Sequence, residues 1–430
     1  MAGELNSKPL GDLCDPERGI TYGIVKVGDY VVGGIPVIRG GDIREGRIVF
    51  DGEKRVTEEV SQQFKRTILK GGEILVNLIA EPGHTAIVPP ALAGANVSRD
   101  VAVIALNDEV DHKYVDYCLK SPMAVNWLRA RLQGSVTQKI NLGTLRDLPI
   151  PTRPRDEQRA ISHILGTLDR KLELNRMMNE TLAAIARALF KSWFVDFDPL
   201  RAKAEKRDPG VPRTLADLFP SSFEQSEVDD IPQGWKVVGL DEIGRFLNGL
   251  ALQKFPPQDG RFLPVIKIAQ LRSEDTSDAD KASADLASDY VVNDGDVLFS
   301  WSGSLECILW ASGKGALNQH LFKVTSDVYP KWFYFLWIGE HLEEFRHIAA
   351  GKATTMGHIQ RGHLSAAKVL IPAAELLNEM THHFAPLINQ IVQLKIASKT
   401  LSAIRDALLP KLISGDLCVP DVERIMGGVM

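Results

Sequence analysis

The sequence of 430 residues lacks most features of secreted, metal-binding or membrane proteins. Its four cysteines, Cys14, Cys118, Cys307 and Cys418, are widely spaced and form no CxxC pair. This spacing argues against a disulfide framework or a zinc site, so we expect reduced thiols that serve as packing residues. No stretch approaches the roughly 20 apolar residues of a membrane span, and the first residues, MAGELNSK, contain no apolar signal core. We therefore expect a cytoplasmic protein with no membrane partner.

Motifs for catalysis are missing as well. The chain has neither a G-x-x-x-x-G-K-[ST] loop nor a G-x-G-x-x-G fingerprint. It lacks the Asn-Pro-Pro-aromatic pocket with which amino-methyltransferases hold a flipped base, and no glutamate is followed two residues later by lysine, the usual signature of metal-dependent restriction nucleases. His358 and His363 have no third ligand type nearby, which favours surface or phosphate-contacting roles over a zinc site. These absences predict a reader or scaffold without metal, cofactor or catalytic residues of its own.

The charge is unfavourable for a chain that holds nucleic acid by itself. The net charge is -5, and only residues 153–213 are net basic, with 13 Lys and Arg against 9 Asp and Glu. Non-specific affinity for DNA comes from neutralising phosphates with Lys and Arg. We therefore expect the chain alone to bind phosphates weakly.

The second half of the chain repeats the order of motifs of the first half. IPVIRGGDIR (35–44) is matched by LPVIKIAQLR (263–272), and GSVTQKINLGTLRDLPIP (134–151) by GKATTMGHIQRGHLSAAKVLIP (351–372). Three further pairs keep the same order: KGGEILVNLIAEPGHTAIV with NDGDVLFSWSGSLECILW, YVDYCL with WFYFLW, and ALFKSW with LLPKLI. The offset of about 220 residues predicts two copies of one unit, because a solenoid would need shorter and more numerous repeats.

Each copy is predicted to hold a β-rich domain followed by a long helix. Short apolar runs such as EILVNLIA and VAVIAL, separated by Gly-acid turns, are typical of strands. The helices show the seven-residue spacing of coiled coils, at Ile161, Leu168, Asn175, Leu182 and Leu189 and again at Met380, Leu387, Leu394, Leu401 and Leu408. Leu165, Leu172 and Ile185 accompany the first series, and Phe384, Ile391 and Ile404 the second. Pro386 falls early in the second run, so this helix either begins there or bends.

The two helices can bury their apolar seams most simply against each other. Because a whole domain separates them in the sequence, the pairing can be antiparallel. The predicted fold class is α+β, with two β-rich domains separated by two long antiparallel coiled-coil helices in an internal pseudo-two-fold repeat. Asn175 lies in the first seam, where it either fixes the register of the pair or faces solvent at an imperfect seam.

The chain resembles a known family in three segments: LPIPTRPRDEQ (148–158), LDRKLELNRMMNETLAAIARALFKSWFVDFDP (168–199) and LLPKLISGDL (408–417). With the duplicated unit, they resemble the specificity subunit of type I restriction-modification enzymes over nearly the whole chain. The resemblance implies that each domain reads one half of a bipartite sequence in double-stranded DNA and that the helices set the distance between the halves. It also implies two docked modification subunits, with restriction subunits joining later, and S-adenosylmethionine, ATP and magnesium on those partners.

Domain boundaries follow from the repeat and the helix signals. They are residues 1–152 for target-recognition domain 1, 153–197 for spacer helix 1, 198–230 for a linker, 231–372 for target-recognition domain 2, 373–415 for spacer helix 2 and 416–430 for a tail.

Candidate DNA-binding residues are the polar side chains of the predicted loops. Arg or Lys suits guanine, Asn or Gln suits adenine, and Ser or Thr suits bases or phosphates. In the first domain they are Arg39, Arg44, Lys65, Arg66, His84, Thr85, Arg99, Ser135, Thr137, Gln138, Lys139 and Asn141. In the second domain they are Lys267, Gln270, Arg272, Ser302, Ser304, Gln319, His320, Lys352, Thr354, Thr355, His358 and Arg361. Exposure or turn capping explains any one of them more simply, but their repeat-equivalent clustering predicts an interface. The acidic residues between Glu274 and Asp296 are expected to face away from DNA.

The most apolar segment of the chain is LFKSWFVDFDPL (189–200). Its apolar residues together cover most of a helix circumference, so they need more than one neighbour: Leu189, Phe190, Trp193, Phe194, Val195 and Phe197. We expect the aromatic residues Phe190, Trp193, Phe194 and Phe197 to pack on the partner helix and on a bound subunit. The alternative is burial wholly within this chain, against the second domain.

Two other functions stay open from the sequence. One is a helical adaptor that binds only proteins, and the other is a fragment of a single-chain restriction or methylation enzyme. The missing catalytic motifs argue against the second of these alternatives.

Overall fold

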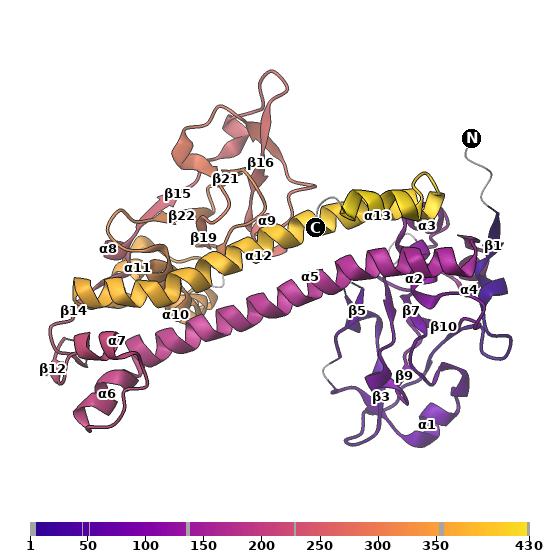
Figure 1. Ribbon diagram of the computed structural model, residues 1–430, viewed down its shortest axis with the longest axis horizontal. Helices are drawn as coiled ribbons and strands as arrows, with labels where there is room; N and C mark the ends of the chain where they lie inside the picture. Colours follow the sequence, from indigo (N-terminus) through magenta and orange to yellow (C-terminus); the bar gives the residue numbers. More distant parts are fainter. Residues whose placement is uncertain are drawn as a thin grey trace. The chain divides into compact units, whose positions relative to one another are not determined.

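The computed structural model describes residues 6–44, 46–50, 52–134, 138–227, 229–351 and 357–427. They divide into two compact units (Figure 1). The described residues within Met1–Lys171 and Leu401–Met430 form unit 1, and those within Leu172–Thr400 form unit 2. Each unit therefore combines one β-rich domain with a part of each of two long helices.

Unit 1 is built around a four-stranded antiparallel sheet in the order β2-β10-β7-β8. Its strands are β2 (Ile20–Tyr22), β10 (Val101–Ile104), β7 (Ile74–Asn77) and β8 (Thr85–Ile87). A second sheet has the order β6-β3-β9, and two further pairs are β4-β5 and β1-β11. Their bounds are β6 (Arg55–Val56), β3 (Ile35–Ile38), β9 (Asn96–Val97), β4 (Ile43–Arg44), β5 (Arg47–Ile48), β1 (Ser7–Pro9) and β11 (Pro149–Pro151). The α-helices of this domain are α1 (Glu58–Gln62), α2 (His112–Lys120), α3 (Pro122–Arg129) and α4 (Leu142–Arg146).

Unit 2 contains the corresponding four-stranded sheet in the order β15-β22-β19-β20. Its strands are β15 (Arg245–Asn248), β22 (Leu321–Thr325), β19 (Val297–Ser300) and β20 (Cys307–Leu309). A second sheet has the order β17-β16-β21-β18, with β17 (Lys281–Ser283), β16 (Phe262–Ile266), β21 (Gly315–Leu317) and β18 (Val291–Val292). Two strand pairs are β14 (Lys236–Gly239) with β23 (Lys368–Ile371) and β12 (Phe223–Gln225) with β13 (Asp230–Pro232). The α-helices of this domain are α8 (Leu240–Ile243), α9 (Ile268–Ser273), α10 (Lys331–Ala350) and α11 (Arg361–Ala366).

The two β-rich domains share a topology down to single residue pairs. Strand β3 runs parallel to β9, as β16 does to β21. Isolated parallel bridges follow at Ile24 with Ser98 and at Leu250 with Asn318. The prediction of two copies of one unit is therefore confirmed.

The long helices are α5 (Arg155–Phe190) and α12 (Ala374–Ser414). In unit 1, the Arg153 guanidinium before α5 donates to the carbonyl of Ile413 at 3.2 Å, and Asp169 pairs with Arg405 at 3.0 Å. Residue numbers thus rise along one helix and fall along the other. Unit 1 therefore contains an antiparallel helix pair, as predicted.

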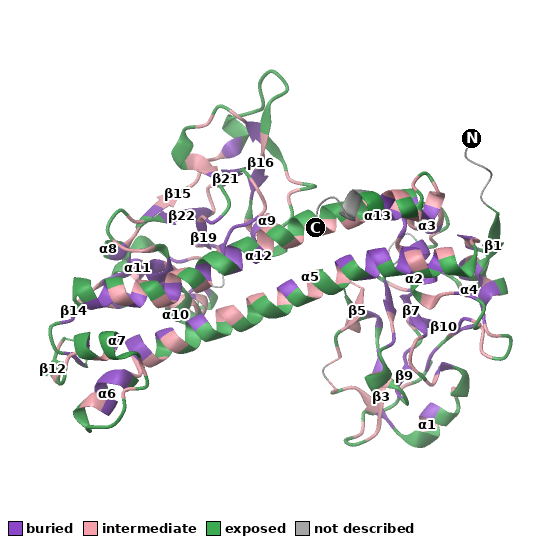
Figure 2. Cartoon of the chain, viewed as in Figure 1, coloured by how far each residue is buried: buried purple, intermediate pink, exposed green. Residues whose placement is uncertain are grey.

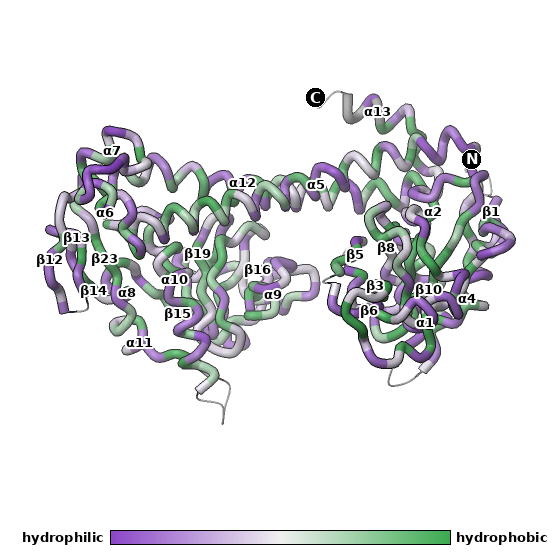
Figure 3. The backbone as a smooth tube through the Cα atoms, turned by 90° about the horizontal axis from the view of Figure 1, so that it is seen from below, coloured by the Kyte–Doolittle hydropathy of each residue, from purple (hydrophilic) through white to green (hydrophobic). Residues whose placement is uncertain are grey.

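Unit 2 contains the same kind of pair. The Asn175 amide donates to the Ser398 hydroxyl at 3.2 Å, and the rings of Trp193 and Phe384 lie 5.2 Å apart. Asn175 is fully buried, so it does not face solvent, and its side-chain oxygen has no hydrogen-bond partner among the described residues. Hydrophobic and hydrophilic residues alternate along α12 (Figure 3).

Some element boundaries differ from the prediction. Helix α12 begins at Ala374 and continues past Pro386, so the helix does not start at that proline. Helix α5 passes into a π-helical turn, η5 (Lys191–Val195), before the predicted end at residue 197. The predicted linker contains α6 (Asp198–Ala204), α7 (Arg213–Leu218) and β12, and the predicted tail contains α13 (Val419–Gly427).

The aromatic residues at and after the end of α5 are buried within unit 2. Phe190, Trp193, Phe194 and Phe197 are 2%, 4%, 1% and 9% exposed. Phe194 lies 5.7 Å from Phe333 and 5.9 Å from Trp337 of α10, measured between ring centroids. These four side chains leave almost no surface for another protein. The expectation that they contact a bound subunit was therefore wrong, and burial within this chain is what the structure shows.

The four cysteines are free thiols. Cys14 and Cys118 are buried, and burial raises the pKa of each thiol to about 12. Cys307 is partly buried, and burial raises its pKa as well, whereas Cys418 is exposed and does not serve as a packing residue. Among the described residues, no helix combines the length and apolar character needed to cross a membrane.

Replacement of Phe194 by alanine should destabilise unit 2. It leaves a cavity among the rings of α10, at a cost of about 3–5 kcal/mol. Phe255→Ala is the matched control, because Phe255 is 39% exposed and leaves a smaller cavity. Urea unfolding of both variants measures the difference. Equal losses for the two would contradict the central packing role of Phe194.

Candidate nucleic-acid interface

Three loops meet in unit 2 where β19 ends and β22 begins. Trp301 and Ser302 follow β19, Gln319 and His320 precede β22, and His358 precedes α11. The loops are joined by main-chain hydrogen bonds, from the Ile359 amide to the Trp301 carbonyl at 2.9 Å and from the Gly303 amide to the Gly357 carbonyl at 2.8 Å. Main-chain hydrogen bonds therefore help to hold the three loops together.

Polar side chains on these loops contact one another. The Ser302 hydroxyl lies 3.2 Å from His320 Nδ1, and the Gln319 amide nitrogen lies 3.4 Å from His320 Nε2. Ser302 is only 4% exposed, so it serves the neighbouring histidine more than a ligand. The structure thus brings together four sequence-predicted residues, with His358 bridged to Ser302 through the backbone.

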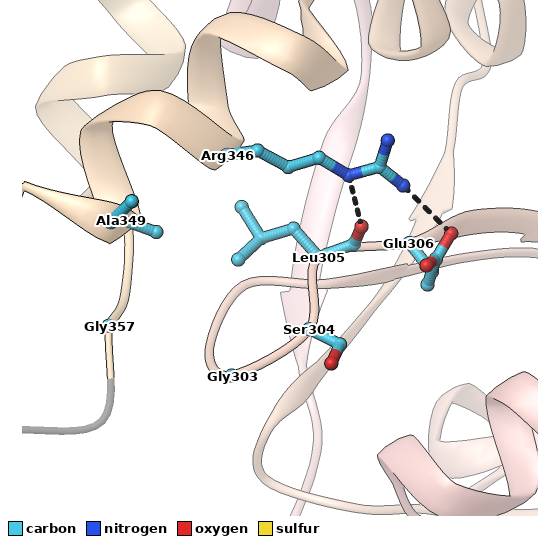
Figure 4. Close-up of a pocket in the computed structure, with 8 residues that line it drawn as sticks. Gly303, Ser304, Leu305, Glu306, Arg346, Ala349 and Gly357 are labelled. Carbon is cyan, nitrogen blue, oxygen red and sulfur yellow. Dashed lines mark hydrogen bonds and ion pairs between the residues drawn. The ribbon is translucent and has the colours of Figure 1, made fainter. Parts of the chain in front are cut away.

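Two further candidates, Ser304 and Arg361, lie close in sequence to Ser302 and His358. The Arg361 guanidinium lies 5.7 Å from the centre of the Phe322 ring and donates to the Phe246 carbonyl at 3.3 Å. Ser304 is exposed and lines a cavity of about 490 Å³. Arg346 spans this cavity and donates to the Leu305 carbonyl at 3.1 Å and to the Glu306 carboxylate at 3.0 Å (Figure 4). The charge of Arg346 is therefore compensated within unit 2.

Lys267, Gln270 and Arg272 lie at or within α9. Lys267 forms an ion pair with Asp280, and the Gln270 side chain accepts a hydrogen bond from the Lys267 amide at 3.3 Å, which caps the helix. Arg272 is exposed. Asp280 therefore lies beside a candidate DNA contact. The expectation that the acidic residues between Glu274 and Asp296 face away from DNA stays a prediction.

Unit 1 repeats the three-loop arrangement. The Ile140 amide donates to the Leu78 carbonyl at 2.9 Å, as Ile359 does to Trp301, and Ile79 bridges Lys139 as Ser302 bridges His358. The exposed candidates on these loops are Arg99, Gln138 and Lys139. Arg39 after β3 is also exposed.

Asp100 joins the loop before β10 to the turn after β3. Its carboxylate accepts a hydrogen bond from the Gly40 amide at 2.9 Å and another from the Ser98 hydroxyl. In the first copy this carboxylate holds the place that His320 occupies in the second, directly before β10 or β22. Sequence reasoning missed Asp100, because the search for base and phosphate contacts considers basic and neutral polar side chains and not carboxylates.

Two candidates of unit 1 have structural roles. Thr85 is 3% exposed, and its hydroxyl donates to Asp116 at 2.6 Å, so its listing as a DNA contact was wrong. The Asn141 side chain accepts from the Thr144 amide at 2.7 Å and caps α4, although the residue is exposed. Thr85 therefore satisfies a buried carboxylate, and Asn141 satisfies an amide at a helix N-terminus.

His84 ends the loop between β7 and β8, which begins with Leu78, whereas the other candidates come from other segments or lie outside the described residues. Arg66 donates to the Arg18 carbonyl at 2.6 Å, next to Lys65 in the turn η3 (Lys65–Thr67). Arg44 donates to the Gly41 carbonyl at 2.7 Å, and exposed His84 lies 3.7 Å from the Glu81 carboxylate. Ser135, Thr137, Lys352, Thr354 and Thr355 lie outside the described residues. Within the described part of the chain, no group of three His, Cys, Asp or Glu side chains could hold a metal ion.

Comparison with known proteins assigns the chain to a family. The family model for the type I restriction modification DNA specificity domain matches residues 3–184 and 232–399, one match for each copy of the repeat. The matches cover more than half of the chain, so the chain belongs to this family of DNA target-recognition subunits. The predicted family resemblance and the α+β fold class with two repeated domains are confirmed.

Individual relatives agree with this assignment. The chain is 26% identical over 426 residues to the type I restriction enzyme MjaIX specificity subunit of Methanocaldococcus jannaschii, covering 96% of this chain and 94% of that one. It is 23% identical over 413 residues to the HindI specificity subunit of Haemophilus influenzae, covering 84% and 89%. The crystal structure of a type I restriction-modification system S subunit from M. genitalium has a TM-score of 0.56 at 16% identity, covering 95% and 96%. That structural likeness shows a shared fold.

Gly249→Ala should distort the loop that carries Gln319 and His320. A Cβ atom at Gly249 would lie 2.2 Å from the Asn318 carbonyl oxygen, too close for any contact, so the loop must shift. We expect a loss of about 1–3 kcal/mol in unfolding free energy. Gly339→Ala in α10 is the control, since nothing lies within 4 Å of its added Cβ and alanine gains about 1 kcal/mol over glycine in a helix. Thermal unfolding measures the melting temperatures of both variants. A shift in the same direction for the two would contradict the close approach of the Asn318 carbonyl to Gly249.

Proposed function

We propose that the chain is a non-catalytic reader of bipartite DNA sequences, in which each unit reads one half of the target through its three-loop interface. The observation that carries this proposal is the repeat of the three-loop arrangement in both units. The Ile140–Leu78 and Ile359–Trp301 hydrogen bonds occupy matching places, yet the side chains around them differ. A common scaffold with different polar side chains suits two half-sites of different sequence.

The differences between the units are chemical. The residues before β10 are Arg99 and Asp100, whereas those before β22 are Gln319 and His320. Arginine matches the acceptors of guanine in the major groove, and glutamine matches the donor and acceptor of adenine. The two units are therefore suited to different bases.

The modest positive charge of both interfaces supports a role for partner subunits. Arg99 and Lys139 are exposed in unit 1, but Lys267 of unit 2 is paired with Asp280. In this proposal two modification subunits supply most phosphate contacts and hold S-adenosylmethionine, and restriction subunits that join them hold ATP and magnesium. The family match to both copies favours this function over a protein-only adaptor.

An apolar stripe on α5 in unit 2 is the proposed docking surface for a modification subunit. Leu174, Met177, Met178 and Ile185 are 49%, 53%, 38% and 43% exposed. Exposed, intermediate and buried residues alternate along α5 (Figure 2). The spacing of three, four and seven residues places these four side chains on one helical face. Exposed methionines adapt readily to a partner surface. This stripe takes the docking role that the buried aromatic residues cannot fill.

The first test of the proposed function measures DNA binding with and without modification subunits. The chain alone should bind duplexes weakly and with little sequence preference, because its net charge is -5. Addition of modification subunits should raise affinity and selectivity together. Titrations at several salt concentrations measure both effects. Equal affinity and equal selectivity in the two preparations would refute the proposal that modification subunits supply most of the phosphate contacts.

A second prediction concerns the apolar stripe. Met177→Glu together with Ile185→Glu should weaken copurification with modification subunits, because a buried unpaired charge costs several kcal/mol. Val328→Glu is the control, since Val328 is 78% exposed and lies outside the stripe. The thermal stability of both variants should match that of the wild type. Unchanged copurification of the double variant would exclude the stripe as the docking surface.

A further inference from the structure

Trp301 links all three loops of the unit 2 interface. Its indole N–H donates to the Asn248 side-chain oxygen at 3.0 Å and lies 3.2 Å from the Gln319 carbonyl oxygen. Its backbone amide lies 3.4 Å from the His320 carbonyl oxygen, and its own carbonyl accepts from Ile359. One residue therefore ties the end of β19 to the loop before β22 and to the segment before α11.

The indole ring also touches the two candidate histidines. Its centroid lies 5.8 Å from that of His320, with the planes inclined by 37°, and 6.3 Å from that of His358, edge to face at 82°. The ring is partly buried and packs on Phe322 below it, at 6.1 Å. Removal of the indole would leave His320 without its neighbouring aromatic surface.

His320 connects the indole ring to the polar side chains of Gln319 and Ser302. The Gln319 amide nitrogen lies 3.4 Å from His320 Nε2, and the Ser302 hydroxyl lies 3.2 Å from His320 Nδ1. The orientation of the Gln319 amide therefore depends on a ring that Trp301 contacts.

Unit 1 forms the same loops without an aromatic residue at this place. Leu78, which occupies the position of Trp301, is 5% exposed and belongs to the hydrophobic core. Asp100 joins the neighbouring loops there instead. The fold therefore does not require tryptophan after this strand. This difference indicates that Trp301 has a role that is particular to unit 2.

We propose that Trp301 is a positioning residue for DNA recognition by unit 2. It orients Gln319 and His320 so that the Gln319 amide reads an A·T base pair in the half-site of this unit, since an amide pairs with the N6 donor and N7 acceptor of adenine. The inference rests on the proposed function and names the residue that sets the specificity of one half-site.

The test uses the full chain assembled with modification subunits and a library of random-sequence DNA duplexes. Bound duplexes are recovered and sequenced for the wild type, Trp301→Leu and Trp301→Phe. Trp301→Leu introduces the residue of unit 1 and should lower the preference for an A·T pair in one half-site about ten-fold, with the other half-site unchanged. Trp301→Phe keeps a ring but loses the N–H, so its loss should be smaller.

Trp127→Leu is the matched control. Trp127 is also partly buried but lies on α3 of unit 1, where the Arg131 guanidinium stacks on it at 3.9 Å. Its replacement removes the same atoms and should leave both half-sites unchanged. A purely structural role of Trp301 would lower binding to all duplexes without changing the selected sequence.

Two results would overturn the inference while the proposed function stands: Trp301→Leu selects the wild-type sequence in both halves, or it loses preference in both halves equally. If Trp301→Leu fails to fold, Asn248→Ala removes one acceptor of the indole N–H and should reduce preference in the same half-site. Unchanged preference in Asn248→Ala and Trp301→Phe would also overturn it. A wild-type assembly that selects no sequence would overturn the proposed function itself and this inference with it.

Discussion

The burial of apolar residues from α5 and α12 is the constraint on which each unit depends. In unit 1, Leu165 of α5 and Leu412 of α12 belong to the core of the β-rich domain. In unit 2, Phe190 at the end of the same helix shares a core with Phe384 of α12 and Trp332 of α10. Neither β-rich domain completes its core from its own segment of sequence. Because burial of apolar surface is the dominant stabilising term, the domain and its helix pair should fold as one cooperative unit.

The sequence predicted the burial of the main seven-residue series of these helices well and that of the accompanying residues less well. Ile161, Leu168 and Asn175 are buried as the seven-residue spacing predicts, but the accompanying Ile185 and Ile404 are 43% and 42% exposed. A straight helix drifts about 20° per heptad from a 3.5-residue repeat, so a companion column rotates out of the seam unless the helices supercoil. The seven-residue spacing therefore identifies the buried face of a helix, but the drift of the helix relative to that spacing decides which residues at the edge of the face become exposed.

The candidate site was predictable as a set of loops but not residue by residue. The repeat placed Lys139 and His358 at equivalent positions, and the structure bridges them to Ile79 and Ser302. Thr85 was misassigned because its partner, Asp116, comes from a helix that composition cannot place against it. Trp301 was missed for a different reason, because rules for reading base edges list polar side chains and pass over the apolar residue that orients them.

The hydrogen bonds that hold the loops explain how two copies of one fold can diverge in function. The bonds from Ile140 to Leu78 and from Ile359 to Trp301 run between main-chain atoms, so they survive any change of side chain that keeps the backbone conformation. The same holds for the parallel bridge from Leu250 to Asn318, where the close approach requires Gly249 and not its neighbours. The scaffold therefore fixes where side chains are presented and leaves their chemistry free. Under the proposed function, a change of half-site then needs substitutions only on the loops, without a matching change in the core.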